Sequence, residues 1–250
     1  MKWEHKCSLT WMKMRQVHLT ASDVKRLLPV TSTGRKRTID ETDYMKVYAS
    51  KLKVLTEEDC MSYGAAARGH ILESYAIDTL NDVLNKHNKK EMYWWDDELL
   101  IRNPQVKWGL AFSPDALSIL PYDYYDFGEK PIAMAEVKCY NEEKHIITAY
   151  TEKNKLEERW QIATAMAVLD SIEEAYLVLF NPDMYRMRCA IREFDRNDLA
   201  EEIEIVNKIE SDWLDFVNTY HMPPCLMTEP SKRIMKDIER CKSSILNPVV

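Results

Sequence analysis

The stretch "FSPDALSIL" (residues 112–120), followed after a tyrosine-rich connection by "AMAEVKCY" (133–140), decides how this chain is interpreted. It places one carboxylate, Asp115, in a proline-led turn, and then Glu136 and Lys138 inside an apolar segment typical of a strand. Charged side chains are rarely buried unless they are paired or bind a metal. The pattern therefore favours a functional site over the alternative, an ordinary ion pair on an edge strand.

The spacing of the three charged residues carries a geometric expectation. Residues two apart on a strand point to the same face, so Glu136 and Lys138 share one side. If the two stretches pair as a hairpin, Asp115 comes close to Glu136, and two adjacent carboxylates repel unless a cation lies between them. Such oxygen ligands suit Mg²⁺ or Mn²⁺, which use one or two carboxylates together with water and phosphate oxygens. Lys138 would then orient a water for attack and stabilise charge that develops on a phosphate.

The bulk composition is that of an ordinary soluble globular protein. The chain has 250 residues, 46% of them hydrophobic and 30% charged, and a net charge of -7. These numbers allow one large domain or two small ones. The negative charge does not by itself indicate a nucleic-acid binder, but a local basic groove is compatible with it. No apolar run is long enough for a membrane span, and "MKWEHKCSLTWMKMRQ" (1–16) lacks the apolar segment of a signal peptide. The six cysteines show no metal-binding spacing, so we expect reduced thiols in a cytoplasmic protein.

Hydrophobic periodicity predicts an α/β protein of the α+β type, with a central mixed sheet flanked by helices. The predicted helices are a short one in "HLTASDVKRLL" (18–28), a long one over 63–86, one over 152–170 and a last one from about 197. The predicted strands lie within 91–140, over "EAYLVLF" (174–180) and over "YRMRCAIREF" (185–194).

The motifs, taken in order, resemble the PD-(D/E)-x-K nuclease superfamily, and within it the phage recombination exonucleases of the lambda exonuclease and YqaJ type. The matching blocks are "LTASDVKRLL" (19–28), "GHILESYAI" (69–77), "AFSPDAL" (111–117), "AEVKC" (135–139), "RWQIATAMAVL" (159–169) and "LFNPDM" (179–184). The resemblance covers residues 15 to about 190. It implies a single nuclease domain over 1–250 with a restriction-endonuclease-like core and a C-terminal helical extension over about 195–250.

The resemblance implies roles for the central residues. Asp115 and Glu136, with the carbonyl of Val137, would bind Mg²⁺, two ions in all, with Mn²⁺ as a substitute. Lys138 would position or activate the attacking water.

Two further residues would complete this centre by the same resemblance. Glu73, on the predicted 63–86 helix, would bind the metal directly or through water; the alternative is a solvated helix glutamate. Gln161 would hydrogen-bond the scissile nucleotide or a metal-bound water; the alternative is a structural glutamine.

The substrate end is also implied by the resemblance. Arg15, Ser22 and Ser113 match the positions that recognise a terminal 5′-phosphate in this family. Independently, Ser22 lies near a predicted helix N-terminus, where free N–H groups favour a phosphate, and an arginine supplies a bidentate fork. The basic run that contains Arg35 and Arg37 would contact the DNA backbone; the alternative is a solvated loop.

Together these features predict a metal-dependent 5′-to-3′ exodeoxyribonuclease that degrades one strand of linear double-stranded DNA and leaves a 3′ overhang for phage homologous recombination. The alternatives are a PD-(D/E)-x-K endonuclease, a single-strand nuclease, or a non-catalytic module that binds DNA ends. The resemblance further implies a phage or prophage protein that acts in the bacterial cytoplasm, cooperates with a single-strand annealing protein, and forms a homo-oligomer, a trimer as in lambda exonuclease.

Overall fold

The structure, a computed structural model, describes residues 4–30, 35–95, 100–103, 105–120, 123, 128–220 and 236. The chain divides into two compact units, Met1–Phe216 and Val217–Val250, and the elements below belong to the first, apart from the last four residues of α8. The helices are α1 (Leu9–Gln16), α2 (Ala21–Arg26), α3 (Glu41–Lys51), α4 (Ala65–Lys86), α6 (Glu142–Tyr150), α7 (Arg159–Val168) and α8 (Ala200–Tyr220). Short 3-10 turns occupy η1 (Glu57–Cys60), η2 (Lys153–Lys155) and η3 (Asn197–Leu199).

Within the described residues, the strands form three sheets. They are β1 (Glu4–Lys6), β2 (Leu19–Thr20), β3 (Met61–Tyr63), β4 (Tyr93–Trp94), β5 (Ile101–Arg102), β6 (Leu110–Phe112), β7 (Ala116–Leu117), β8 (Ala133–Lys138), β9 (Glu174–Phe180) and β10 (Cys189–Asp195). The largest sheet has the order β10-β9-β8-β7-β4, with β8 and β9 parallel and the other neighbours antiparallel. A second sheet has the order β2-β6-β5, and β1 pairs with β3. The predicted fold class, a mixed sheet flanked by helices, is confirmed.

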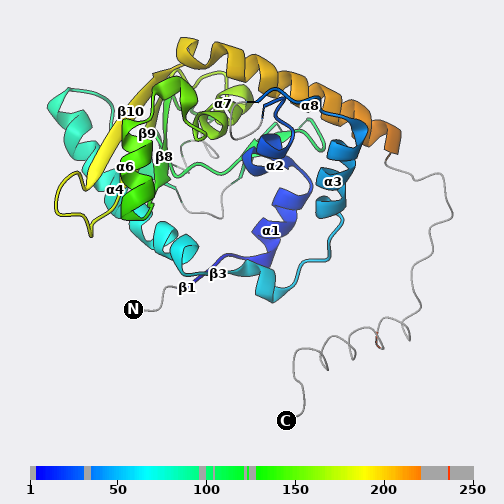
Figure 1. Cartoon of the computed structure of the whole chain (residues 1–250), viewed down its shortest axis with the longest axis horizontal. Helices are drawn as coiled ribbons and strands as arrows, with labels where there is room; N and C mark the ends of the chain where they lie inside the picture. Colours follow the sequence, from blue (N-terminus) through cyan, green and yellow to red (C-terminus); the bar gives the residue numbers. More distant parts are fainter. Residues whose placement is uncertain are drawn as a thin grey trace. The chain divides into compact units, whose positions relative to one another are not determined.

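Helix α4 covers one face of the five-stranded sheet (Figure 1). Its buried residues recur three or four positions apart and pack against alternate residues of β8, because residues two apart on a strand share a face. The contacting core residues include Ala76, Ile77, Leu80 and Leu84 of α4 with Ala133, Ala135 and Val137 of β8. The intervening residues of β8, which include Glu136 and Lys138, therefore project from the other face.

The three-stranded sheet joins the N-terminal strand β2 to strand β6 from the middle of the sequence. Strand β2 runs parallel to β6, with Leu19 opposite Leu110 and Thr20 opposite Ala111. Gly109 lies just before β6, where an added Cβ would come within 2.8 Å of the Glu210 carboxylate of α8. That carboxylate accepts a hydrogen bond from the Leu110 N–H at 2.7 Å, so α8 holds this strand directly.

Several element boundaries differ from the sequence-based prediction. Helix α4 begins at Ala65, after Gly64 adopts a positive φ of 60°, whereas the helix was expected from residue 63. The helix expected over 152–170 is divided into η2 and α7. Strand β9 has the predicted bounds, but β10 begins at Cys189 and not at Tyr185. Helices α1, α3 and α6 were not predicted.

The C-terminal extension is described only in part. Helix α8 continues from η3, as expected for a last helix that starts near residue 197. From residue 221 on, only residue 236 belongs to the described part, so the remainder of the predicted extension lies outside it. No helix among the described residues is both long enough and apolar enough to cross a membrane.

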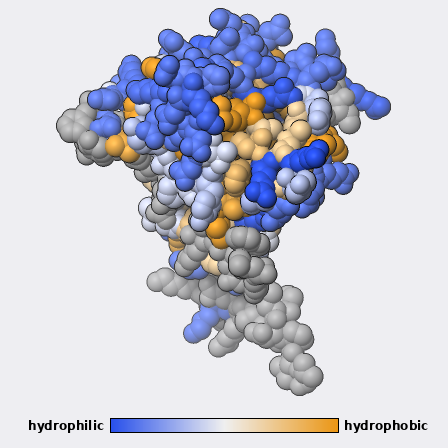
Figure 2. All heavy atoms as spheres, turned by 90° about the vertical axis from the view of Figure 1, so that its left-hand side faces the viewer, coloured by the Kyte–Doolittle hydropathy of each residue, from blue (hydrophilic) through white to orange (hydrophobic). Residues whose placement is uncertain are grey.

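Figure 2 looks onto the side of the molecule on which α4, α6 and β10 lie in Figure 1. Hydrophilic side chains cover most of this side, and hydrophobic ones reach the surface between them. Two of the exposed hydrophobic residues on α6 are Ile147 and Tyr150, which are 59% and 73% exposed.

Candidate active site

A pocket of about 190 Å³ opens where α1, α2, α4 and α7 meet strand β6, the turn that follows it, and strand β8. It is lined by most of the residues that the sequence singled out: Arg15, Ser22, Glu73, Ser113, Asp115, Glu136, Val137, Lys138 and Gln161. These residues come from six separate segments of the chain, so the fold brings together what the sequence keeps far apart.

The pairing of β7 with β8 sets the position of Asp115. Ala116 lies opposite Ala135 in an antiparallel register, which places the preceding turn beside the C-terminal half of β8. The Asp115 Oδ2 atom accepts a hydrogen bond from the Val137 N–H at 2.6 Å. The hairpin that the sequence predicted between these two segments is therefore present, and it holds Asp115 next to Glu136.

Glu136 is the centre of the polar contacts in the pocket. Its residue is only 6% exposed, and its Oε1 atom accepts hydrogen bonds from both Lys138 and Gln161. The Gln161 Nε2 atom donates at 2.8 Å from helix α7, which packs against β6 and α2. Gln161 thus contacts a predicted metal ligand.

Glu73 reaches the pocket from α4. It is buried, and its Oε1 atom lies 3.3 Å from the Nδ1 atom of His70, one turn earlier on the same helix. A solvated helix glutamate, the alternative weighed from the sequence, does not describe this position.

The carboxylates dominate the electrostatics of the pocket. Burial raises the pKa of Asp115 well above its usual range, and the charges of Glu136 and Glu73 raise it further. Burial alone would lower the pKa of Lys138, but Glu136 and Asp115 outweigh burial, and the pKa is raised. The amine is therefore held as an ammonium among three carboxylates.

This donor set fits a divalent cation by its chemistry. Three acidic side chains share the pocket with Lys138 and Arg15, and Mg²⁺ and Mn²⁺ prefer oxygen donors while they keep several waters. Among the residues that the structure describes, no three His, Cys, Asp or Glu side chains stand close enough to form a ready-made metal site. Asp115 and Glu136, with the Val137 carbonyl, are the residues that would hold the ion, and Glu73 would join them directly or through water.

A hydrogen-bond network fixes the first turn of α4 to the end of β8. The Arg68 guanidinium donates to the carbonyl of Cys139 at 3.3 Å, to Asn181 Oδ1 at 3.1 Å and to Asp183 Oδ2 at 2.8 Å. Asn181, which is fully buried, in turn donates to the Tyr140 carbonyl at 3.1 Å. The segment "LFNPDM" thus ties the strand that carries Glu136 to the helix that carries Glu73.

The predicted phosphate-binding residues lie at one end of the pocket. Because β2 pairs with β6, the start of α2 with Ser22 lies near Ser113, and both line the pocket with Arg15. The Arg15 guanidinium lies 4.5 Å from the centre of the Trp11 ring, within cation–π distance.

The buried residues Asp23 and Lys51 hold the segments that carry Arg15 and Ser22. Asp23 accepts hydrogen bonds from the Thr20 N–H at 2.9 Å and the Thr20 hydroxyl at 2.6 Å, which caps α2. The Lys51 ammonium contacts Asp23 at 2.5 Å and the Arg15 carbonyl at 3.2 Å. The ends of α1 and α2 are thereby held together.

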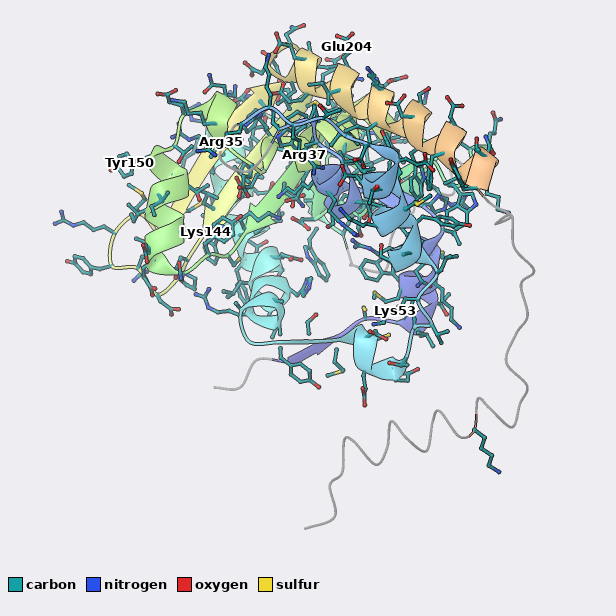
Figure 3. The ribbon with its side chains drawn as sticks, turned by 45° about the vertical axis from the view of Figure 1, so that its right-hand side comes forward. Arg35, Arg37, Lys53, Lys144, Tyr150 and Glu204 are labelled. Carbon is teal, nitrogen blue, oxygen red and sulfur yellow. The ribbon has the colours of Figure 1, made fainter. Side chains whose placement is uncertain are left out.

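Arg35 and Arg37 do not line the pocket. They lie on the connection between α2 and α3 (Figure 3). The Arg37 guanidinium donates to the carbonyls of Leu28 and Arg26 and lies 3.6 Å from Asp43, so it stabilises this connection. Contact of either arginine with DNA stays a prediction.

Seven lining residues were not predicted from the sequence as site residues: Trp11, Thr20, Ala21, His70, Leu100, Phe112 and Met134. His70 was noted beside the Glu73 motif but given no role, although its spacing of three residues places it on the same side of a helix. Trp11 lies on α1, a helix that the periodicity did not reveal.

One solved structure that resembles this chain is that of an alkaline exonuclease, LHK-Exo, from Laribacter hongkongensis. It is 18% identical in sequence, the match covers 86% of this chain and 98% of that one, and the TM-score is 0.56. The fold is that of an alkaline exonuclease. The same exonuclease in complex with dAMP matches with a TM-score of 0.51 at 16% identity, over 86% of this chain and 98% of that one. A phage-related exonuclease from Haemophilus somnus matches with a TM-score of 0.47 at 11% identity, over 84% of this chain and 100% of that one.

No protein-family model matches the sequence, and no curated protein is significantly similar to it. The resemblance stated from the motifs is thus confirmed through the alkaline-exonuclease fold at low sequence identity.

Proposed function

We propose that this chain is a metal-dependent exodeoxyribonuclease that degrades one strand of linear duplex DNA in the 5′-to-3′ direction and leaves a 3′ overhang. The observation that carries the proposal is the convergence of Asp115, Glu136 and Lys138 with Ser22 and Ser113 in one pocket. Acidic metal ligands beside hydroxyl groups suit a phosphodiester next to a terminal phosphate. The likeness to a solved alkaline exonuclease supports a nuclease on the same fold.

The side chains of the pocket divide the chemistry between them. A divalent cation, when bound, supplies polarisation of the phosphate and charge neutralisation. Lys138, held as an ammonium by its carboxylate neighbours, donates hydrogen bonds toward the attacking water or the phosphate oxygens. Gln161 fixes the rotamer of Glu136, so the carboxylate keeps one orientation.

The Arg15 end of the pocket would bind the terminal phosphate. An arginine fork forms two parallel hydrogen bonds with a phosphate, and serine hydroxyls add single ones. This arrangement would set the distance between the DNA end and the reacting bond, which is why we assign polarity from the 5′ end.

The biological setting follows from the motif resemblance. We propose that the protein is encoded by a phage or prophage, acts in the bacterial cytoplasm, and passes its 3′ overhang to a single-strand annealing protein. We also propose a homo-oligomer, with a trimer as the expected state, because a ring of identical subunits would enclose the DNA.

The deciding experiment compares linear and covalently closed circular duplex DNA in the presence of Mg²⁺. We expect progressive shortening of one strand of the linear DNA and no nicking of the circle. The Asp115→Asn variant serves as the inactive control, since it keeps the volume of the side chain and removes one charge. Prompt nicking of the circle would reject the exonuclease assignment in favour of an endonuclease.

A further inference from the structure

A group of exposed aromatic and basic side chains lies outside the pocket, on α6 and on the connection between β9 and β10. We call it the α6–hairpin surface and define it by Lys144, Ile147, Tyr150, Tyr185, Arg186 and Arg188. Tyr150 is 73% exposed and Tyr185 89% exposed, unusually high values for rings of this size. Figure 3 shows Lys144 and Tyr150 on α6.

The two parts of this surface are joined through buried contacts. His145, on the inner side of α6, is completely buried, and it lies near the backbone of Met187 without a hydrogen bond to either ring nitrogen. Arg192 of β10 donates a hydrogen bond to the Ala149 carbonyl near the end of α6. Met187 has a left-handed backbone with φ of 58°, which is uncommon for a residue with a side chain. The connection is therefore held against the helix in a defined conformation.

The cations of this surface have neutral partners. Arg188 donates to the Met184 carbonyl at 2.8 Å, Arg186 lies 5.9 Å from the centre of the Tyr185 ring, and the Lys144 ammonium lies 3.9 Å from the Tyr140 ring. Among the residues that the structure describes, no carboxylate forms an ion pair with these three. Their charge is thus available to an anionic partner, in a protein whose net charge is -7.

The surface begins close to the pocket. Tyr140 follows the pocket residue Lys138 by two positions, its hydroxyl donates to the buried Glu158, and its ring carries the Lys144 ammonium. A chain that leaves the pocket past Lys138 would meet this ring and cation first.

We propose that the α6–hairpin surface binds single-stranded DNA, with bases stacked on Tyr150 and Tyr185 and the backbone beside Arg186, Arg188 and Lys144. Aromatic rings interleaved with cations are how proteins hold a single strand without sequence preference, because every base has a face that stacks. A duplex hides these faces, so it cannot use the rings. The proposal rests on the proposed function in one respect: the bound strand would be one that continues from the duplex end in the pocket.

Two glutamates next to the α6–hairpin surface distinguish a DNA partner from a basic protein partner. Glu142 and Glu143 are exposed in the first turn of α6, and Glu143 lies one turn before Ile147. A carboxylate there repels a phosphate backbone. Removing it by Glu143→Gln should tighten single-strand binding, whereas a surface for a basic protein partner would respond in the opposite sense.

The experiment measures fluorescence anisotropy with a labelled 20-nucleotide oligodeoxythymidylate that lacks a 5′-phosphate. It uses the full chain with Asp115→Asn in EDTA, so that neither cleavage nor the terminal-phosphate contacts contribute. We expect the Tyr150→Ala/Tyr185→Ala double variant to bind roughly tenfold or more weakly, and the two tyrosine-to-phenylalanine changes to keep the affinity. For Arg186→Ala/Arg188→Ala, the slope of log affinity against log salt should fall by about 1.4, since each single-strand phosphate contact contributes about 0.7.

Matched controls come from exposed residues elsewhere. Tyr75→Ala removes a tyrosine that is 59% exposed on α4, and Lys86→Ala/Lys208→Ala removes two exposed cations from α4 and α8. Both should bind like the parent. The proposal is wrong if the parent fails to bind the oligonucleotide or if the surface variants bind as tightly as the parent. It is also wrong if the control variants lose as much affinity as the surface variants, or if a hairpin-capped duplex competes as well as the single strand. If the wild-type protein proves not to be a nuclease, these binding measurements still decide the question.

Discussion

We propose that Lys138 acts as a hydrogen-bond donor in the cleavage reaction. Its ammonium contacts Glu136, and the charges of Glu136 and Asp115 keep its pKa above the usual value despite burial. An ammonium in contact with Glu136 can donate hydrogen bonds to a water or a phosphate oxygen, so we propose that Lys138 orients the water and stabilises developing charge. A donor role predicts different cleavage rates for Lys138→Ala and Lys138→Arg, whereas a general-base role predicts that both variants are equally inactive.

We expect Lys138→Ala to lower the cleavage rate about 10²- to 10³-fold, a loss typical for removal of one donor to a transition-state charge. Lys138→Arg should keep more activity, because a guanidinium also donates while permanently protonated. Single-turnover cleavage of a 5′-phosphorylated duplex measures the rates, and anisotropy with the same duplex should show binding within a few-fold of wild type. If Lys138→Arg is as inactive as Lys138→Ala, the role as a simple donor is wrong.

The Arg15 end of the pocket makes a prediction about end preference. Wild-type protein should cleave a 5′-phosphorylated end faster than a 5′-hydroxyl end, because the fork of Arg15 and the hydroxyl of Ser113 bind the extra charge. Arg15→Ala should reduce this preference by about tenfold or more, since a charge-assisted hydrogen bond is worth about 1.5–3 kcal/mol. Rates on the two substrates measure the ratio. Equal wild-type rates on both ends would remove the phosphate-binding role.

At the scale of elements, the active site depends on how α4 is attached to β8. Arg68 joins the two by donating to the Cys139 carbonyl and to the buried Asn181, and its contact with the exposed Asp183 is a surface ion pair. We expect Arg68→Ala to destabilise the fold by about 1–3 kcal/mol, because the half-buried Cys139 carbonyl loses its Arg68 donor and the buried Asn181 Oδ1 atom keeps only the Asp183 N–H. It should also lower the cleavage rate, since Glu73 and Glu136 lose their common support.

Asp183→Ala is the matched control for this network. Its side chain is 68% exposed, so loss of the ion pair should cost less than about 1 kcal/mol. Urea denaturation gives the two free energies of unfolding, and Arg68→Lys tests the fork, because an ammonium cannot reach both acceptors in the same geometry. Equal costs for Arg68→Ala and Asp183→Ala would show that the buried contacts contribute nothing.

The hydrophobic pattern of the sequence predicted some helices and strands and missed others. The long periodic stripe of α4 and the continuous apolar run of β9 were predicted within a few residues, because their burial repeats over many turns or the whole strand. Helix α1 buries only Trp11, and α6 buries only His145 and Thr148, so neither has an apolar stripe to find. Their N-caps, Ser8 and Asn141, were the remaining signal.

The residues that line the pocket were predicted better than the elements that carry them. Asp115, Glu136 and Lys138 stood out because charge inside apolar strands needs a partner, and the hairpin geometry followed from the two-residue repeat. His70 and Trp11 did not stand out, since a histidine on a helix and a tryptophan near the N-terminus have ordinary structural uses. Their place in the pocket depends on contacts between segments distant in sequence, which periodicity does not encode.

For the whole molecule, two buried histidines couple folding to pH. His18 is 5% exposed and His145 is not exposed at all. Burial lowers the pKa of both below the usual histidine value of 6.5, with Arg102 adding to the effect at His18. Below pH 6.5 the unfolded chain takes up protons at these positions and the folded chain does not. Their contribution to stability is therefore complete above pH 6.5 and is lost as the pH falls below it.

We expect the free energy of unfolding to change by up to about 1.4 kcal/mol per pH unit for each of these histidines just below pH 6.5. Other groups act in the same range, and Asp115, whose pKa is raised, acts in the opposite direction. The test is therefore a difference: urea denaturation of wild type and His145→Gln at pH 7.5, 6.5 and 5.5. The variant is expected to be less stable at pH 7.5, because it disturbs a packed site, but to lose less stability than wild type between pH 6.5 and 5.5. If the two proteins lose the same free energy over that interval, His145 is protonated in the folded state. Water would then reach His145 beneath α6, and the packing that supports the α6–hairpin surface would be looser than the structure shows.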